Sequence, residues 1–589
     1  MQVINTDIAI IGGGGAGLSS AIAIAEQAPH LNIALISKVY PMRSHTVAAE
    51  GGAAGVIKPS DSFDLHFYDT VAGGDWLCEQ DVVDLFVKQA PKALAKLERL
   101  GCPFARQADG SVNVRRFGGM KVERTWFAAD KTGFHLLHTL FQSSLQFPNI
   151  HRFDEYFLLD LLVDDGKITG LVALNMLAGE LVQINAKSVI MATGGAARIY
   201  QHNTNGTIVT GEGMALAYRH GVVLRDMEFV QFHPTGLPGS GILMTEACRG
   251  EGGILINKHG YRYLQDYGLG PETPLNQPKN RYMELGPRDK LSQAFWLESQ
   301  KGNTEQTAHG DVVYLDLRHL GANKINQRLP FIRELAKVYM NIDPVNSPIP
   351  VKPTAHYMMG GIATDIHCAT TIKGLYAVGE CASVGLHGAN RLGSNSLSET
   401  LVFGEIAGQQ AIQYVNNQSV SFNHNASQAE QIEKSLQQLV HHNGTEKSTQ
   451  IHKEMCEAMD KDCGVYRHES GMLNALNKIT ELLERADNIT VNDKSHVFNT
   501  ELISVLELKQ SLHVAQAVAY SALLRKESRG AHQRLEPEYK NRDDKNFLKH
   551  SLASYNAGDL PTISYSDVKI TQLPPASRNY GDNEQVAKV

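Results

Sequence analysis

Basic and polar residues recur beside glycines and prolines in five stretches of the sequence. These stretches are 231–236 (QFHPTG), 245–252 (TEACRGEG), 286–289 (GPRD), 356–361 (HYMMGG) and 387–393 (HGANRLG). Each stretch alone has an ordinary explanation, because a loop arginine is most often a solvated surface charge and a His-Pro pair is most often a turn. Together they offer three arginines and three histidines on loops. That set suits a small substrate with two carboxylates, since arginine binds a carboxylate through two parallel hydrogen bonds.

The N-terminus has the pattern of a dinucleotide-binding unit. Gly12, Gly14 and Gly17 satisfy G-x-G-x-x-G, which provides a tight turn, close approach of a pyrophosphate and helix-on-strand packing. The predicted elements around it are a strand at 8–11, a small-residue helix at 18–26 and a strand at 33–36. As a bare pattern this is only a glycine-rich turn, but the strand–turn–helix context predicts dinucleotide binding. Ser37 and Lys38 stand where an acidic residue usually holds the ribose, which weighs against NAD and leaves FAD open.

One histidine follows this motif among small residues. Residues 40–52 read YPMRSHTVAAEGG, so His45 has glycines and alanines around it that leave room for a large flat ring. Taken alone, His45 is better explained as an ordinary loop histidine. In its context we predict that it is joined covalently to a flavin, with the dicarboxylate pocket built over that ring.

The rest of the chain supplies the elements that position these residues. Two more strands end in glycine, at 188–195 and 374–380, which suggests one cofactor domain interrupted by an insertion from about Gly236 to Val351. Helices are expected at 81–100 and from His135, and hairpin strands at 153–163 and 170–175. Residues 416–431 are predicted to be a polar linker, followed by helices with Met472, Leu476, Ile479 and Leu483 on one face and a longer helix at 502–524. The charged tail at 527–548 is expected on the surface.

Composition excludes several classes of protein. The chain of 589 residues is long enough for several domains, and a net charge of −7 gives no indication of a nucleic-acid surface. Its seven cysteines are an odd number without any C-x-x-C spacing, so a disulfide framework, a zinc site and a self-contained iron–sulfur site are not expected. We find no signal peptide and no apolar run of the ~18–20 residues needed to span a bilayer. A cytoplasmic chain attached to the membrane only through a partner is therefore expected.

Several motifs in one order match a known family. The chain closely resembles the flavoprotein subunit of the succinate dehydrogenase/fumarate reductase family, most of all its quinol:fumarate reductase branch, over essentially its whole length. The motifs that carry the resemblance are 44–46 (SHT), 233–236 (HPTG), 245–250 (TEACRG), 387–397 and 525–532 (RKESRGAH). The resemblance implies an α/β fold, in which an FAD-binding Rossmann-like domain (1–235 and 353–415) is interrupted by an α+β capping domain (236–352). A helical domain (416–547) and a C-terminal segment (548–589) would follow.

The resemblance also implies roles for individual residues. His45 would carry FAD through the flavin 8α position. The two substrate carboxylates would be held by His233, Thr245, His356 and Arg391. Arg288 would donate a proton to the substrate carbon and be reloaded through Glu246 and Arg249, with His233 also in the catalytic group. The cofactor would be lined by Gly12, Gly13, Gly14, Gly15, Ala16, Ser37, Lys38, Ser44, His45, Thr46, Val47, Ala48, Ala49, Glu50, Gly51, Gly52, Tyr156, Phe157, Leu158, Glu212, His356, Tyr357, Glu380, Arg391, Ser396 and Leu397.

Two residues depart from patterns in the family. Glu212 stands where the family usually has Asp, and we expect only a modest change in cofactor contact. Glu50 stands where succinate dehydrogenases generally have Gln, whereas fumarate reductases resembling this chain have Glu. A carboxylate near the isoalloxazine would lower the flavin potential, and we take this as a hypothesis for the fumarate-reducing direction.

The implied activity is reduction of fumarate to succinate in anaerobic respiration, with the reverse reaction open. Electrons would pass through an iron–sulfur subunit, with membrane anchor subunits and quinol reached indirectly, at the cytoplasmic face of the cell membrane. A succinate dehydrogenase subunit working mainly in the oxidative direction is the alternative. An L-aspartate oxidase-like enzyme is disfavoured by the covalent attachment expected at His45. A self-sufficient soluble reductase would need its own electron input. A non-catalytic FAD-binding scaffold would not need the intact set of His233, Arg288, His356 and Arg391, which we call the clamp.

Overall fold

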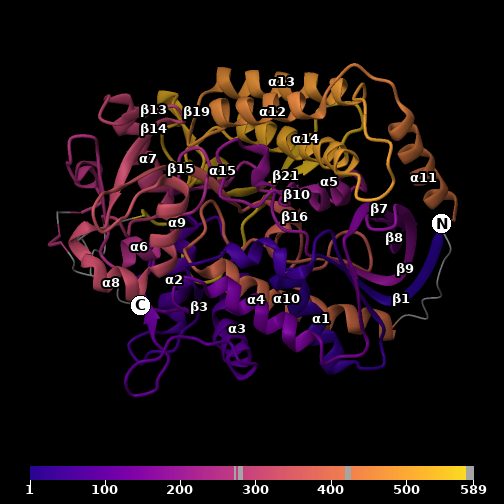
Figure 1. Ribbon diagram of the computed structural model, residues 1–589, viewed down its shortest axis with the longest axis horizontal. Helices are drawn as coiled ribbons and strands as arrows, with labels where there is room; N and C mark the ends of the chain where they lie inside the picture. Colours follow the sequence, from indigo (N-terminus) through magenta and orange to yellow (C-terminus); the bar gives the residue numbers. More distant parts are fainter. Residues whose placement is uncertain (271–272, 276–282, 418–425, 579–589) are drawn as a thin grey trace.

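The computed structural model describes residues 1–270, 273–275, 283–417 and 426–578 (Figure 1). Its central element is a seven-stranded sheet in the order β6-β2-β1-β9-β8-β7, with β17 also paired to β9. Strands β1, β2, β6, β9 and β17 run parallel to one another, and β7 and β8 form an antiparallel hairpin that joins the sheet antiparallel to β9. The bounds are β1 (Gln2–Ile11), β2 (Ile33–Ser37), β6 (Ile150–Asp154), β7 (Tyr156–Asp164), β8 (Lys167–Asn175), β9 (Glu180–Met191) and β17 (Leu375–Ala377).

The three strands that end in glycine lie side by side, as the sequence predicted. β9 pairs with β1 on one side and with β17 on the other. β9 ends at Met191, whereas β17 begins only at Leu375. Their side chains form continuous apolar runs, such as Ile8–Ile11, that are buried on both faces of the sheet. This is the pattern of parallel strands. Their carboxyl ends therefore meet at one edge, where ligands bind in open α/β sheets.

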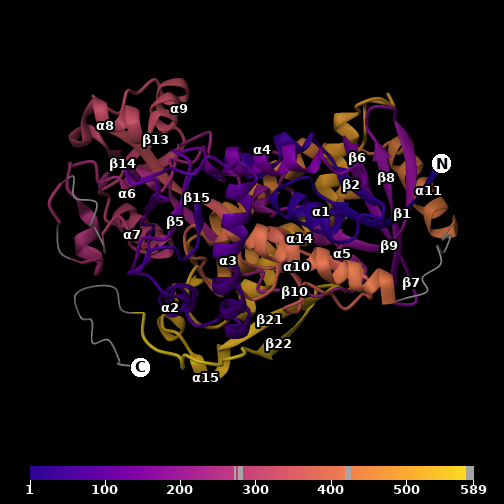
Figure 2. The ribbon, with the colours of Figure 1, turned by 90° about the horizontal axis from the view of Figure 1, so that it is seen from below.

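Helices cover one side of this sheet (Figures 1 and 2). α1 packs against α10 and α4, and α10 packs against α3. α1 begins within the glycine motif rather than at Leu18, and α4 begins before His135, because the predicted starts marked the first apolar residues and not the first turns. The bounds are α1 (Gly15–Gln27), α2 (Phe63–Gly73), α3 (Gln80–Arg99), α4 (Thr132–Ser144), α5 (Glu212–Arg219) and α10 (Asn395–Asn417). Short strands β3 (Ala53–Ala54), β4 (Val114–Arg115) and β5 (Thr125–Trp126) form a small separate sheet.

The predicted insertion has its own apolar core, around Leu255, Leu291 and Leu315. Strands β11 and β15, which lead into and out of it, pair with each other in the sheet β11-β15-β14-β12. The bounds are β11 (Val230–Gly236), α6 (Ala247–Gly250), β12 (Ile254–Ile256), α7 (Arg288–Gln300), β13 (Glu305–Thr307), β14 (Gly310–Asp316), α8 (Gly321–Arg328), α9 (Pro330–Met340) and β15 (Ile349–Met358). This unit lies at one end of the molecule, on the left in Figures 1 and 2.

The segment after α10 is helical, with two corrections. Residues 426–431 begin α11 and 416–417 end α10, so these parts of the predicted linker are wrong, while 418–425 lie outside the described residues. On α13, Met472, Leu476 and Ile479 are buried as predicted, but Leu482 is buried where Leu483 was expected. The bounds are α11 (Ala426–His441), α12 (Ser448–Asp462), α13 (Glu469–Ala486) and α14 (Thr500–Leu524).

The prediction that the charged tail at 527–548 lies on the surface is wrong for 527–536, most of which is buried, whereas 537–548 is exposed or partly exposed. Arg525, Arg529 and Arg534 are fully buried. Each is paired with a carboxylate, as in the bond from Arg529 Nε to Glu527 Oε1 (2.8 Å), and paired charges can be buried where single ones cannot. Beyond this segment, a hairpin of two strands extends the sheet β18-β16-β10-β21-β22. The bounds are β10 (Leu224–Arg225), β16 (Gly361–Ala363), β18 (Ala382–Ser383), β19 (Tyr466–Arg467), β20 (Gln533–Arg534), α15 (Asp544–Phe547), β21 (Lys549–Ser554) and β22 (Thr562–Asp567). Of the helices in the described ranges, none combines the length and the apolar character needed to cross a bilayer.

Candidate functional site

A cavity of about 670 Å³ lies where the carboxyl ends of β1, β2, β9 and β17 meet the insertion. Gly12, Ala192 and Val378 line it from the sheet side, and Phe331 and Leu335 of α9 line it from the insertion. Most residues predicted to contact cofactor or substrate also line it. They are Gly12, Gly14, Gly15, Ala16, Ser37, Lys38, the whole run from Ser44 to Gly52, Tyr156, Leu158, Glu212, His233, Thr245, Glu246, Arg288, His356, Tyr357, Glu380, Arg391, Ser396 and Leu397.

Three predicted residues do not line this cavity. Phe157 is buried in the core of the sheet, because successive side chains on β7 point to opposite faces and its neighbours Tyr156 and Leu158 take the cavity side. A Cβ on Gly13 would lie 3.0 Å from the side chain of Pro41, so this glycine faces the chain and not the cavity. Arg249 is fully buried behind Glu246.

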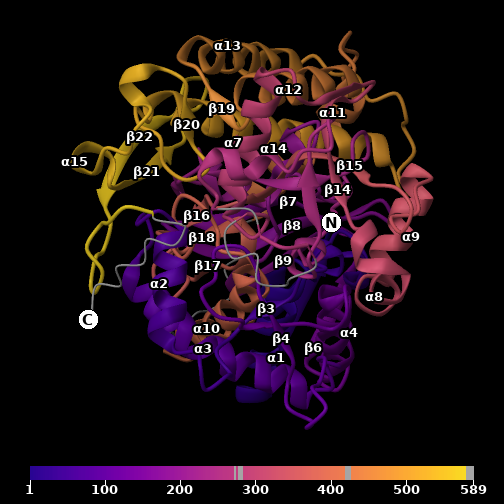
Figure 3. The same ribbon diagram turned by 90° about the vertical axis from the view of Figure 1, so that its left-hand side faces the viewer.

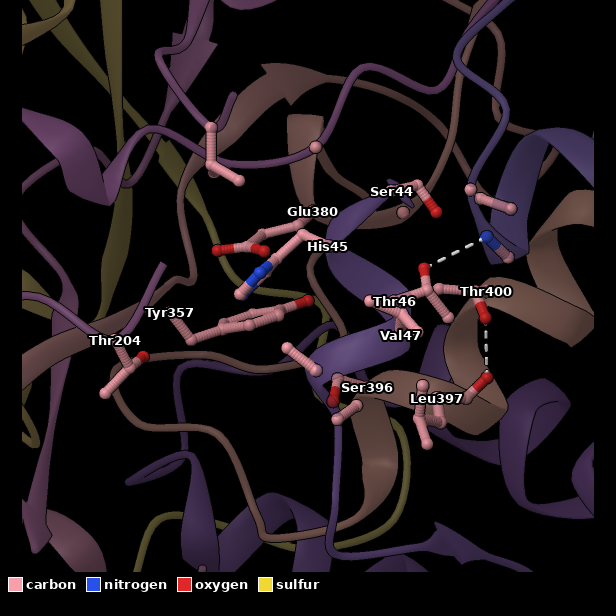
Figure 4. A pocket seen from close by; sticks show the side chains of 18 of the residues that line it. Ser44, His45, Thr46, Val47, Thr204, Tyr357, Glu380, Ser396, Leu397 and Thr400 are labelled. Atoms are coloured by element: carbon pink, nitrogen blue, oxygen red, sulfur yellow. Dashed lines mark hydrogen bonds between the residues drawn. The ribbon is translucent and has the colours of Figure 1, made fainter. Parts of the chain in front are cut away.

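The glycine motif has the geometry that its spacing predicted. Gly12 has φ of +119°, and a Cβ on it would lie 2.1 Å from the carbonyl oxygen of Ala192. A Cβ on Gly17 would lie 1.9 Å from the carbonyl oxygen of Gly12, so α1 packs against the turn at a distance that only glycine permits. The amide of Gly15 donates to Thr46 Oγ1 at 3.1 Å, which ties the start of α1 to the segment that carries His45 (Figure 4).

Two predicted cofactor residues, Lys38 and Glu212, form an ion pair just beyond the end of β2. Lys38 Nζ lies 2.5 Å from Glu212 and 2.7 Å from Glu507 of α14, and all three side chains are largely buried. Burial opposes the charged form of Lys38, but the two carboxylates raise its pKa above the ordinary value. The positive charge of Lys38 is therefore neutralised within the protein, and Glu212 contributes to an ion pair at the cavity wall.

His45 lies on a short 3-10 helix (His45–Ala48) and projects into the cavity near Glu380 and Tyr357 (Figure 4). The amide of Gly206 donates to His45 Nδ1 at 3.3 Å. Burial lowers the pKa of His45 to about 4, so the ring is neutral near pH 7. With Nδ1 acting as an acceptor, Nε2 is the nitrogen left for a bond to a cofactor.

Buried polar atoms along the cavity fit a bound cofactor. Ser44 Oγ, Glu50 Oε2 and Thr193 Oγ1 are buried and have no hydrogen-bond partner among the residues that the structure describes. Because a buried polar group without a partner is costly, these atoms are suited to contacts with a polar ligand. Ser44, Glu50 and Thr193 all line the cavity that the glycine turn and His45 also line, so a dinucleotide bound there could satisfy them.

Beyond His45, two arginines converge on one glutamine. Gln231 Oε1 accepts from Arg288 Nη1 at 3.0 Å and from Arg391 Nη2 at 3.2 Å. Arg391 also lies over the ring of Tyr357, at 4.1 Å from its centroid, and donates to Ser396. Burial lowers the pKa of Arg391 to about 10, which leaves it charged at neutral pH. The result is a fixed pair of guanidinium groups at one wall of the cavity.

Two histidines complete this wall. The rings of His233 and His356 meet edge to face, with centroids 5.1 Å apart. Burial, and then the charge of Arg288, holds both pKa values well below 6.5, so both rings are neutral. Thr235 N–H donates to His233 Nδ1 at 3.3 Å, and His233 Nε2 is buried with no partner in the described part of the chain. His233 Nε2–H is therefore available to a ligand oxygen.

A carboxylate lies directly behind Arg288. Glu246 Oε2 accepts from Arg288 Nε at 2.9 Å, Arg249 Nη2 is 3.9 Å from the same oxygen, and Glu246 also accepts from Gly118 N. Burial opposes ionisation of Glu246, but the two arginines lower its pKa below the ordinary value. The order Arg249, Glu246, Arg288 is a chain of charged groups that leads from the interior to the cavity.

The sequence did not identify the residues that hold the clamp in place. Gln231 was noticed only as part of a motif, although it immediately precedes the Phe-His-Pro run on β11. Thr204 Oγ1 lies 2.7 Å from His356 Nδ1, and Glu399 Oε2 lies 2.7 Å from the hydroxyl of Tyr357 and 2.8 Å from His387 Nε2. None of these positions has a local pattern that separates it from ordinary polar residues.

The sheet, the glycine turn and the cavity define a flavoprotein of the FAD-binding class, and residues 7–397 match the FAD binding domain family. Residues 452–580 match the fumarate reductase flavoprotein C-terminal family. The fumarate reductase flavoprotein subunit of Serratia sp. (strain ATCC 39006) is 65% identical, covering 99% of this chain and 97% of that protein. The one from Escherichia coli (strain K12) is 64% identical, covering 100% of this chain and 98% of that protein. A solved E. coli quinol fumarate reductase chain has a TM-score of 0.97 at 64% identity, covering 98% of this chain and 99% of that chain.

This chain therefore belongs to the family of fumarate reductase flavoprotein subunits, which are FAD-dependent oxidoreductases. The resemblance drawn from its motifs, the α/β fold class and FAD as cofactor are confirmed.

Proposed function

We propose that this chain is the catalytic subunit of a membrane-associated quinol:fumarate reductase, with FAD joined covalently to His45. The observation that carries the proposal is the placement of His233, Arg288, His356 and Arg391 around the cavity that also receives His45. When bound, FAD supplies the hydride for one alkene carbon of fumarate. The protein must then bind both carboxylates, exclude water and deliver a proton to the other carbon.

The clamp binds the two carboxylates of the substrate. Arg391 is charged and held by Tyr357 and Ser396, so it can bind one carboxylate bidentately without losing much side-chain entropy. The neutral rings of His233 and His356 add single N–H donors, and Thr245 adds a hydroxyl at the cavity wall. Gripping both ends of the diacid fixes the alkene for transfer, and orientation of this kind contributes several kcal/mol to catalysis, up to about 7–11.

Proton delivery falls to Arg288. Its guanidinium lines the cavity and is bonded to Glu246 at 2.9 Å. Guanidinium holds its proton strongly, so donation requires a more basic carbanion and a base that returns the proton at once. Glu246 is kept ionised by its two arginines, so it can accept a proton from Arg249 and pass it to Arg288 once Arg288 has given its own to the substrate carbon. A proton relay Arg249–Glu246–Arg288 follows.

His45 is the residue to which the flavin is attached. A neutral imidazole is the nucleophilic form, and burial keeps the pKa of His45 low enough to maintain it. An imidazole bonded to the flavin through Nε2, with the Nε2 proton released, keeps the Nδ1 lone pair that accepts from the Gly206 amide, so this contact fits attachment at Nε2. A covalent link to an electron-withdrawing imidazole raises the flavin potential, which suits exchange with the fumarate/succinate couple.

Electrons reach this chain from partner proteins. In the described residues no group of His, Cys, Asp and Glu has the arrangement of a metal site. We propose that an iron–sulfur subunit docks near the flavin and that membrane anchor subunits, which react with quinol, hold the complex at the cytoplasmic face of the cell membrane. We further propose the domain division 1–235 with 353–415, 236–352, 416–547 and 548–589, supported by the pairing of β11 with β15 at the boundaries of the insertion.

The proposal is tested by supplying reduced viologen dye and fumarate to the purified complex. Wild type should turn over, and Arg288→Gln should lower kcat by about 100-fold or more, because general acid catalysis is worth roughly 10²–10⁴. Arg333→Gln is the matched control, since Arg333 pairs with Asp343 on the outer side of α9. A wild-type complex without turnover, or an Arg288→Gln variant as active as Arg333→Gln, would contradict the proposal and favour a binding scaffold.

A further inference from the structure

The last described segment of the chain is bound tightly to the start of α3. Gln80 is fully buried. Its side-chain oxygen accepts from the backbone amides of Thr571, Gln572 and Leu573 at 2.8–3.0 Å, and its Nε2 donates to Leu573 O at 2.7 Å. Figures 2 and 3 show this yellow segment passing α2. Four bonds to one buried amide fix the path of the tail before it reaches Arg578.

Arg578 forms a two-pronged ion pair with the insertion. Its Nη1 lies 2.7 Å from Asp289 Oδ2, and its Nη2 lies 3.2 Å from Asp289 Oδ1. The two side chains are only 6% and 1% exposed. Arg578 Nη2 also donates to Gly73 O at 3.3 Å, and Nη1 lies 3.7 Å from Asp75, just after α2. One guanidinium thus joins the C-terminal tail, the end of α2 and the first turn of α7.

Asp289 is the residue that follows the proton donor. Arg288 and Asp289 both belong to the first turn of α7, so their backbones move together. On the cavity side, Arg288 is held by Glu246 and Gln231. Asp289, in the same turn, bonds through its carboxylate to Arg578. The next turn of α7 is held by Ser292 and Gln293, which donate to backbone oxygens. The position of the guanidinium of Arg288 is therefore set from both sides.

We propose that Arg578 is a positioning residue for proton delivery to the substrate: it fixes the first turn of α7 against the end of α2, so that Arg288 is aligned between Glu246 and the reacting carbon. The inference rests on the proposed function and adds the C-terminal tail to its machinery. Arg578 touches neither substrate nor cofactor cavity, since it is not among the residues that line the cavity. Its effect is transmitted through the buried carboxylate of Asp289, which loses its charge partner when Arg578 is removed.

The test compares Arg578→Gln with wild type in the purified complex, using reduced viologen dye and fumarate. We expect kcat to fall about 10- to 100-fold, because a displacement of the order of 1 Å costs about that much. KM for fumarate and covalent flavin content should be unchanged, and the solvent deuterium isotope effect on kcat should rise because proton delivery becomes slower. Arg578→Lys should recover part of the loss, since ammonium keeps the charge but not the fork geometry. Lys569→Gln, in the same tail with an exposed pair to Asp81, is the matched control and should behave as wild type.

If the Arg578→Gln protein does not fold and cannot be purified, a second variant tests the same inference. Asp289→Asn breaks the same pair from the other side, and the double variant should lose no more than the larger single loss. Three results would overturn the inference. The first is an unchanged kcat in Arg578→Gln, and the second is a double variant in which the two losses add. The third is a kcat that falls only in proportion to flavin content, with an unchanged isotope effect. A wild-type complex that reduces no fumarate would overturn the proposed function as well, whereas wild-type turnover with unaffected variants would overturn this inference alone.

Discussion

Burial sets the charge state of the side chains nearest the flavin position. His45, His233 and His356 are all held neutral, so the positive charge in the cavity comes from arginines. Arginine stays protonated at any pH near neutrality, whereas a histidine of ordinary pKa would lose its charge as the pH rises through about 6.5. The clamp is consequently independent of pH across the physiological range, and the neutral histidines act through directed N–H groups.

Glu50 behaves differently from the charged carboxylate that its sequence position suggested. Burial raises its pKa well above the ordinary value, the charge of Asp130 adds to this effect, and Arg115 opposes it. A raised pKa in an acid favours the neutral form until the pH passes the raised value, so the charge that would lower the flavin potential appears only as the pH rises. The hypothesis for the direction of the reaction stays a prediction and acquires a pH dependence.

We predict that the effect of Glu50→Gln grows with pH. At the acid end of a range from about pH 6 to about pH 9, more of the wild-type Glu50 is in the neutral form, which a glutamine imitates, so the ratio of fumarate reduction to succinate oxidation should be closest in the two proteins. As the pH rises, ionisation of Glu50 should raise this ratio in the wild type only. The two rates are measured over that range in both proteins. A difference that is the same at every pH, or no difference at any pH, would refute the role of its charge.

At the scale of elements, buried ion pairs connect segments that are distant in the sequence. Arg525, at the end of α14, contacts Glu228 just before β11 and Glu527 in the tail, and all three side chains are fully buried. Lys38 at the end of β2 is joined to Glu507 of α14 in the same way. These contacts dock the helical bundle on the cofactor-binding part, where an apolar contact alone would set no register.

We expect Arg525→Met to lower the free energy of unfolding by about 3–5 kcal/mol, because it leaves the buried carboxylate of Glu228 without its charge partner, whereas Glu527 keeps Arg529. Lys453→Met is the control: Lys453 pairs with Glu457 on exposed positions of α12, where such a pair is worth about 0.5 kcal/mol or less. Urea midpoints of the two variants, compared at equal slope, measure the difference. Equal midpoints would mean that the buried network contributes nothing specific.

At the scale of the whole molecule, the cavity is assembled from segments that the chain visits hundreds of residues apart. The glycine turn and the strands that end in glycine carry local patterns, so the sequence predicted the sheet around β1, β9 and β17. Most of the cavity lining was expected only from the resemblance to the family. Side-chain direction is less local: Phe157 was expected at the cofactor and lies in the core, since a register on β7 decides which face it takes.

The buried tail could not be predicted for a related reason. Residues 527–548 are dense in charge, and composition alone indicates a solvated surface. The buried part, 527–536, contacts Asp75, which lies hundreds of residues earlier, and no local pattern announces a pairing of that kind. The same holds for Gln231 and Arg578, whose roles follow from what they touch and not from the residues beside them in the sequence.

The account depends most directly on a flavin held by His45 in the cavity that the arginine clamp lines. Mass spectrometry of the tryptic fragment that begins at Ser44, prepared from fully active complex, measures this attachment. We predict that the fragment carries the added mass of FAD and that fragmentation places the addition on His45. An unmodified fragment from protein that reduces fumarate at the full rate would contradict the account.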